Sequence, residues 1–78
     1  MSRLVYVSNE DCHFCAHGRA VLDELGVERR EISSESDDAA KLAARGIPLS
    51  FLPVLIDGDH LIAYGRFSAK QLRKKLAL

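Results

Sequence analysis

The stretch "LVYVSNEDCHFCAHG", Leu4 to Gly18, joins an apolar run to a pair of closely spaced cysteines. "LVYV" is short and lacks clean alternation, which predicts a central β-strand covered on both faces. "SNED" supplies turn and cap residue types, with Asp11 as the expected N-cap of a helix. Apolar residues then recur at helical spacing as far as Gly26, so the sequence places Cys12 at the first turn of a helix and Cys15 one turn inside it.

The next two segments continue an alternation of strand and helix. "VERREI", residues 27–32, has apolar ends and a charged middle, which predicts a strand at a sheet edge where charges discourage pairing with other chains. "SSESDDAAKLAARG", residues 33–46, begins with capping residue types and ends at a glycine, as a short helix does. This order argues for two parallel strands joined by a right-handed crossover.

The last third of the chain predicts a hairpin followed by a helix. Asp57-Gly58 lies between two apolar runs, which indicates antiparallel strands over about residues 54–56 and 60–64. Ser68 precedes Gln71 by three residues, the spacing of a capping box. The residue before this cap, Phe67, is placed to pack on Leu72 as a hydrophobic staple.

Length and composition indicate one small globular domain over residues 1–78. Apolar residues make up 47% and charged residues 28% of the chain, which is enough to build one core. The formal net charge is zero and the basic residues are spread along the chain, so we expect neither nucleic acid nor a membrane as partner. No signal peptide or membrane-spanning run is recognisable, and we expect a cytoplasmic monomer.

The cysteine pair allows three interpretations. A permanent disulfide between Cys12 and Cys15 is unusual in a reducing compartment, and so short a loop removes little entropy from the unfolded chain. A zinc or copper site could draw on these thiols with His17 and either His13 or His60, but the second pair of cysteines or histidines typical of structural zinc is missing. We therefore expect no metal site and favour a pair of thiols that is oxidised and reduced repeatedly.

Element order, length, the "CHFC" motif at the first strand-to-helix junction, Pro53 before the hairpin and the "DG" turn together resemble the glutaredoxin family over the whole chain. The resemblance implies a minimal thioredoxin fold of the α/β class, β-α-β-α-β-β-α, with a four-stranded mixed sheet and three helices. It implies a thiol-disulfide oxidoreductase in which Cys12 is the nucleophile and Cys15 the resolving thiol. It also implies that the Leu52–Pro53 peptide bond is cis and that the Leu52 backbone pairs with a bound substrate.

By the same resemblance, the residues expected to contact substrate are His13, Phe14, Leu52 and Pro53, with Phe14 as a partly exposed wall beside the thiols. Several positions differ from the family pattern. His13 replaces a proline, Phe51 and Leu52 replace a threonine-valine pair, and Ala63-Tyr64 replaces a glycine pair that helps to hold glutathione.

We expect no tightly bound cofactor and consider protein disulfides and glutathione mixed disulfides as substrates. Glutathione, acting as co-substrate, and thioredoxin reductase are the alternative electron donors. An iron–sulfur cluster shared between two subunits, as some glutaredoxins assemble, is a further alternative.

The charges around the first cysteine act in opposite directions. Only the thiolate attacks a disulfide, and a helix N-terminus favours that anion through its free N–H groups and dipole. The neighbouring carboxylates of Glu10 and Asp11 oppose it. A protonated His13 would favour it again, since histidine titrates near the working pH.

Overall fold

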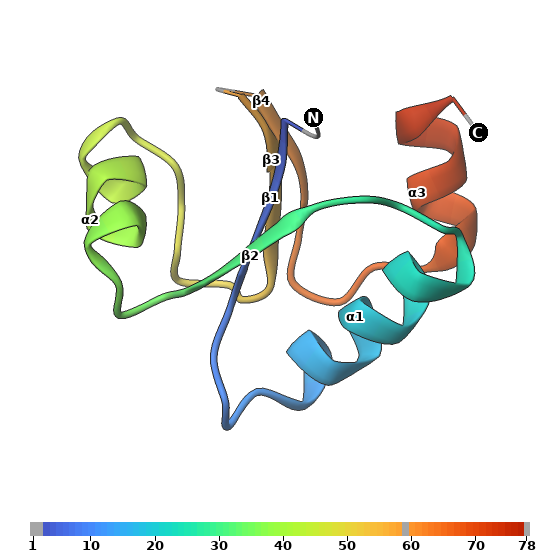
Figure 1. Ribbon diagram of the computed structural model, residues 1–78, viewed down its shortest axis with the longest axis horizontal. Coiled ribbons are helices and arrows are strands. Elements are labelled where there is room, and N and C mark those ends of the chain that lie inside the picture. Colours follow the sequence, from blue (N-terminus) through green and yellow to red (C-terminus); the bar gives the residue numbers. More distant parts are fainter. Residues whose placement is uncertain (1–2, 59, 78) are drawn as a thin grey trace.

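The computed structural model describes residues 3–58 and 60–77 as a four-stranded sheet with three helices. The strands are β1 (Leu4–Ser8), β2 (Arg30–Ser33), β3 (Val54–Asp57) and β4 (His60–Tyr64), and the helices are α1 (His13–Glu24), α2 (Asp37–Ala44) and α3 (Ala69–Leu76). The strand order is β2-β1-β3-β4, with β1 parallel to β2 and antiparallel to β3 (Figure 1). This is the predicted mixed sheet of a minimal thioredoxin fold.

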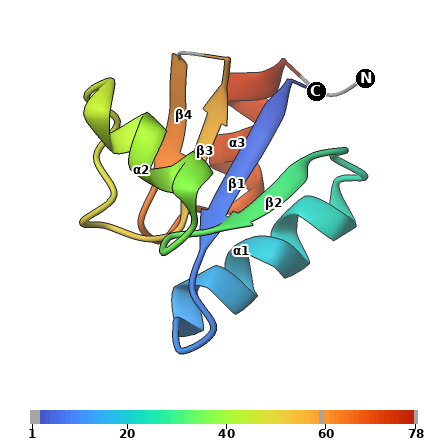
Figure 2. The same ribbon diagram turned by 60° about the vertical axis from the view of Figure 1, so that its left-hand side comes forward.

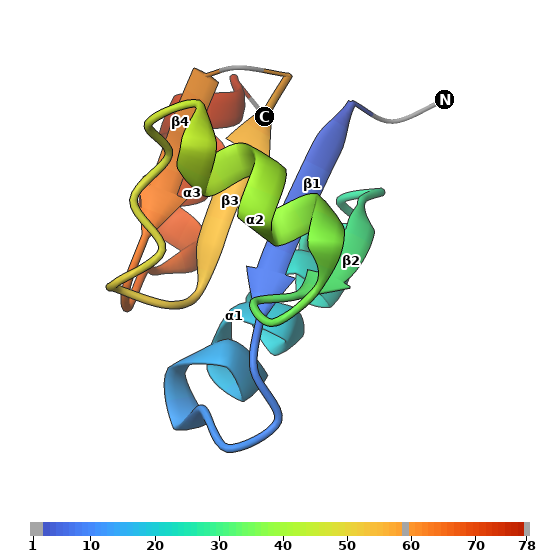
Figure 3. The same ribbon diagram turned by 90° about the vertical axis from the view of Figure 1, so that its left-hand side faces the viewer.

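The helices cover both faces of the sheet, α1 and α3 on one and α2 on the other (Figures 2 and 3). Neighbouring residues of β1 point to opposite faces, and Tyr6 and Val7 lie in separate core clusters. The Tyr6 cluster includes Leu22 of α1 and Leu72 of α3. The Val7 cluster includes Leu42 of α2. The prediction of a central strand covered on both faces is therefore confirmed.

The second strand begins later than the sequence suggested, at Arg30 instead of Val27. The Val27 N–H donates to the carbonyl oxygen of Leu22 at 2.9 Å, and the Gly26 N–H donates to that of Asp23 at 3.1 Å. These two bonds, with Gly26 at a φ of 66°, form a Schellman motif that ends α1. Val27 is thus part of the helix termination and packs into the core, so it is not available to the strand.

The terminal helix begins as predicted. The Ser68 hydroxyl accepts the Gln71 N–H at 3.2 Å, and the Gln71 side chain accepts the Ser68 N–H at 3.0 Å, which completes the capping box. Phe67 and Leu72 are both buried in the same core cluster, as the hydrophobic staple requires. Within the described parts of the chain, no helix is long and apolar enough to cross a membrane.

Candidate active site

Cys12 is itself the N-cap of α1, which corrects the prediction that Asp11 has this role. Its backbone is extended, with φ −105° and ψ 110°, and its Sγ accepts the N–H of Cys15 at 3.1 Å. A thiolate accepts such a bond more strongly than a thiol does. The sulfur therefore takes the place that a serine or aspartate oxygen occupies in an ordinary cap.

The loop before the helix explains why the cap falls one residue later. The Asn9 side-chain oxygen accepts the Asp11 N–H at 3.2 Å, and the Asn9 carbonyl oxygen accepts the Cys12 N–H at 3.3 Å. The Asn9 amide in turn donates to the Ser34 hydroxyl at 3.3 Å. This Asx turn holds Asp11 outside the helix, which then begins at His13.

Cys15 lies one turn inside α1 and is fully buried, whereas Cys12 is partly exposed. Burial, followed by hydrogen bonding with the Cys12 side chain, raises the pKa of the Cys15 thiol to about 11. Both cysteines are free thiols. The two thiols thus differ as an attacking and a resolving thiol must, one accessible and one protected and protonated near neutral pH.

The backbone at Leu52–Pro53 lies against the first cysteine, and this peptide bond is cis, as predicted. Cys12 Sγ is 3.9 Å from the Leu52 carbonyl oxygen. Pro53 is buried, and the Gly65 N–H donates to the carbonyl oxygens of both Phe51 and Pro53, at 2.9 and 2.8 Å. The end of β4 therefore fixes the loop that faces the cysteine.

The other candidate residues lie on the exposed surface of α1 and at the hairpin. His13 and Phe14 form the exposed start of α1, and the Phe14 side chain is 50% exposed. His17 is also exposed on α1, whereas His60 lies at the start of β4, at the hairpin. Among the described residues, no group of three histidine, cysteine, aspartate or glutamate side chains converges to hold a metal ion.

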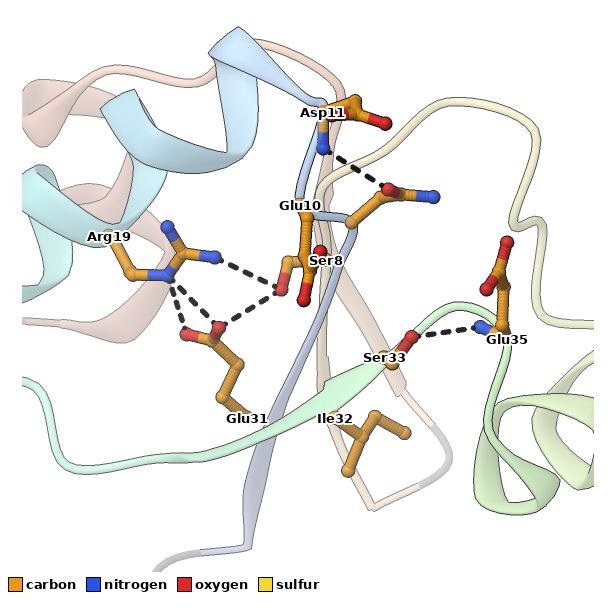
Figure 4. Close-up of a pocket in the computed structure, with 9 residues that line it drawn as sticks. Ser8, Glu10, Asp11, Arg19, Glu31, Ile32, Ser33 and Glu35 are labelled. Carbon is orange, nitrogen blue, oxygen red and sulfur yellow. Dashed lines mark hydrogen bonds and ion pairs between the residues drawn. The ribbon is translucent and has the colours of Figure 1, made fainter.

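A polar groove of about 460 Å³ opens beside the loop that leads to Cys12 (Figure 4). Arg19 Nε donates to both Glu31 carboxylate oxygens, at 2.9 and 3.0 Å, and Arg19 Nη2 lies 3.3 Å from the Ser8 hydroxyl oxygen. The hydrogen bonds from Arg19 hold the pKa of the Glu31 carboxyl group below its ordinary value. Neither cysteine lines the groove. Its walls also carry three carboxylates, of Glu10, Asp11 and Glu35.

Two features of this region were not apparent from the sequence. One is the Arg19–Glu31 ion pair, whose partners are twelve residues apart and carry no motif. The other is the contact between Phe51 and Tyr64, whose ring centroids are 6.1 Å apart. Each of these aromatics stood out only as a departure from the family pattern, and nothing in the sequence indicated that they touch.

The fold and the cysteine pair define the chain as a minimal thioredoxin fold with a CxxC motif at the start of its first helix. It is similar to a solved structure, the glutaredoxin (grx-1) from Archaeoglobus fulgidus, with a TM-score of 0.69 and 18% sequence identity. The alignment covers 97% of this chain and 87% of that one. No protein-family model and no curated protein matches the sequence. The likeness supports the glutaredoxin-like fold.

Proposed function

We propose that this protein is a thiol-disulfide oxidoreductase that reduces protein or glutathione mixed disulfides through Cys12 and Cys15. The observation that carries the proposal is the asymmetry of the pair. Cys12 is partly exposed and caps α1 with its sulfur, whereas Cys15 is fully buried one turn away. This arrangement suits a thiol that attacks and a thiol that resolves.

The proposed reaction transfers two electrons. The Cys12 thiolate attacks one sulfur of the substrate disulfide, and the other sulfur leaves as a thiolate that takes up a proton. The Cys15 thiol then loses its proton and attacks Cys12, which releases the second substrate thiol. The substrate disulfide is reduced to two thiols, and the cysteine pair is oxidised to a disulfide. An external thiol or a reductase restores the dithiol form.

The backbone next to Cys12 is suited to hold a substrate chain. Within residues 3–58 and 60–77, the Leu52 N–H has no hydrogen-bond acceptor, and its carbonyl oxygen faces the Cys12 sulfur. An extended chain that crosses Cys12 would pair with these groups as an added strand does. The cis bond to Pro53 fixes the direction of this backbone. The exposed side chains of His13 and Phe14, at the start of α1, contact the substrate.

The physiological reductant can be identified by a coupled assay. The protein is given a small mixed disulfide, and NADPH oxidation is followed with either glutathione and glutathione reductase or thioredoxin reductase alone. Turnover in either system supports the oxidoreductase, and the system that works identifies the electron donor. The absence of turnover with both, and with dithiothreitol as reductant, would overturn the proposal.

Serine variants assign the two thiols. We expect Cys12→Ser to abolish turnover in every system. Cys15→Ser is expected to keep the first attack and to accumulate a mixed disulfide with Cys12, visible by mass spectrometry of the intact protein. Accumulation on Cys15 in the Cys12→Ser variant would reverse the assignment.

A further inference from the structure

Two aromatic side chains lie exposed beside the loop that faces Cys12. Phe51 is 63% exposed and Tyr64 is 54% exposed, and their rings contact each other at 6.1 Å between centroids. They come from different segments, one from the loop before β3 and one from the end of β4. The Gly65 N–H, which donates to the Phe51 carbonyl oxygen at 2.9 Å, holds the two segments together. We call Phe51 and Tyr64 the aromatic pair.

One member of the aromatic pair, Phe51, is adjacent in the chain to the residue whose backbone contacts the reactive sulfur. Phe51 precedes Leu52, whose carbonyl oxygen is 3.9 Å from Cys12 Sγ. In an extended chain, successive residues are about 3.3–3.6 Å apart along the strand. A substrate cysteine at Cys12 therefore places a residue one or two positions along the same chain within reach of these rings.

We propose that the aromatic pair binds an aromatic side chain that flanks the disulfide cysteine of a polypeptide substrate. This inference rests on the proposed function and names the substrate class that the site prefers. An aromatic side chain stacked on these rings gains an edge or face contact, and both partners lose apolar surface to water. The pair would thus select peptide disulfides by the residue next to the cysteine.

Charge argues for a polypeptide over glutathione as the occupant. Glutathione offers no apolar side chain, and its two carboxylates and one amine give it a net negative charge. Glu10 and Asp11 are exposed immediately before Cys12, so the site repels such a ligand. A neutral or basic peptide meets no such repulsion and gains the aromatic contact.

The size of the aromatic pair argues against a second copy of this chain as the occupant. Aromatic side chains present about 150–250 Å² each, so two partly exposed rings offer at most about 300 Å². A stable interface buries about 800 Å² on each partner. The pair suits one side chain of a short segment better than the flat contact of a dimer.

The test uses two peptides that differ at one position. Each carries one cysteine joined by a disulfide to a chromophoric thiol, with phenylalanine or glycine as the next residue, and dithiothreitol is the reductant. We expect kcat/KM to be about three- to tenfold higher for the phenylalanine peptide, the range of one aromatic contact. Phe51→Ser and Tyr64→Ser should each bring that ratio close to one.

Leu61→Ser is the matched control, because Leu61 is also an exposed apolar side chain on β4 but lies toward the hairpin. This variant should keep the ratio of the natural protein. A kcat/KM ratio of one in the natural protein would overturn the inference. So would an equal fall of this ratio in Phe51→Ser, Tyr64→Ser and Leu61→Ser. So would dimers that dissociate on Phe51→Ser in sedimentation. Reduction of neither peptide would count against the proposed function, whereas equal reduction of both would count against the aromatic pair alone.

Discussion

The Tyr6 hydroxyl donates a hydrogen bond of 2.6 Å to the backbone carbonyl oxygen of Cys15. Tyr6 is fully buried at the centre of the sheet, so this bond joins β1 directly to the turn of α1 that carries the buried Cys15. Burial is also the main cause that raises the pKa of the phenol, and the hydroxyl stays a donor across the physiological range. The position of the buried cysteine is therefore set from the core.

Removing this hydroxyl should lower stability with little change of shape. We expect Tyr6→Phe to reduce the free energy of unfolding by about 0.5–1.5 kcal/mol, the usual net value of a hydrogen bond. For a domain of this size, each kcal/mol corresponds to about 4–8 °C in Tm. Tyr64→Phe is the control, because its ring is 54% exposed. Equal losses in the two variants would contradict the role of the buried bond.

Gly18 is required by the close approach of α1 to the sheet. A Cβ at this position would overlap the Tyr6 hydroxyl oxygen and lie 2.9 Å from Phe67 Cζ. Alanine is better than glycine in a helix by about 1 kcal/mol. Here we nevertheless expect Gly18→Ala to destabilise the fold by about 1–3 kcal/mol, as overpacking does.

A double-mutant cycle tests this cause. In the Tyr6→Phe background the nearest atom is absent, so Gly18→Ala should cost less than it does in the natural protein. Coupling of about 0.5 kcal/mol or more by denaturant unfolding is the expected result for residues in contact. Strict additivity would mean that the hydroxyl is not the obstacle.

The reactivity of Cys15 should follow its raised pKa. With a pKa of about 11, caused first by burial, the thiol is almost entirely protonated at neutral pH. In the Cys12→Ser variant, which keeps the burial of Cys15 but loses the hydrogen bond with the Cys12 thiol, alkylation of Cys15 by iodoacetamide should be slow at pH 7 and should still rise about tenfold per pH unit above pH 8.5. In the natural protein Cys12 should be modified first. A rate that levels off near pH 8.5 would contradict the prediction.

The same shift predicts a loss of stability in alkali. The Cys15 pKa is raised in the folded state, so the folded protein keeps this proton while the unfolded chain releases it above about pH 8.5–9. The stabilisation is present below the unfolded value and is lost as the pH rises towards about 11. Between these limits, the free energy of unfolding of Cys15→Ala should fall less with pH than that of the natural protein. Parallel curves of unfolding free energy against pH would argue against the raised pKa.

The carboxylates before Cys12 should slow its reaction with anionic disulfides. Two charges at about 7 Å each oppose an anion by about 0.6 kcal/mol in a water-like dielectric. The double variant Glu10→Gln/Asp11→Asn should therefore react about five- to tenfold faster with an anionic disulfide. The measurement is the ratio of rates with an anionic and a neutral aryl disulfide, because changes in the thiolate itself cancel in this ratio. The increase should shrink at 1 M salt.

Glu24→Gln provides the control for this charge effect. Glu24 is the last residue of α1, and twelve helical residues place it about 18 Å from the start of the helix. The Glu24→Gln substitution also removes a negative charge, but it should leave the ratio of the rates with the anionic and the neutral disulfide unchanged. An equal effect from Glu24 would show that the whole protein's charge, and not the local pair, controls the rate.

The sequence by itself determined the elements whose signals are local. Helical periodicity, the Ser68–Gln71 capping box and the Asp57-Gly58 hairpin signal each act within a few residues. The helices, the capping box and the hairpin lie where they were expected, although β3 extends one residue further, to Asp57, which pairs with His60. The CxxC motif was placed correctly at a helix start for the same reason. The cis bond at Pro53 was foreseen only through the family resemblance, because the chain immediately around it does not require that isomer.

The tertiary structure alone decided the features that depend on distant residues. Cys12 became the N-cap because Asn9 bonds both to its own loop and to Ser34. Phe51 meets Tyr64 because the β3–β4 register brings the end of β4 beside the loop before β3. Such contacts depend on how the strands align, and strand register is a property of the folded sheet that no short stretch of sequence contains.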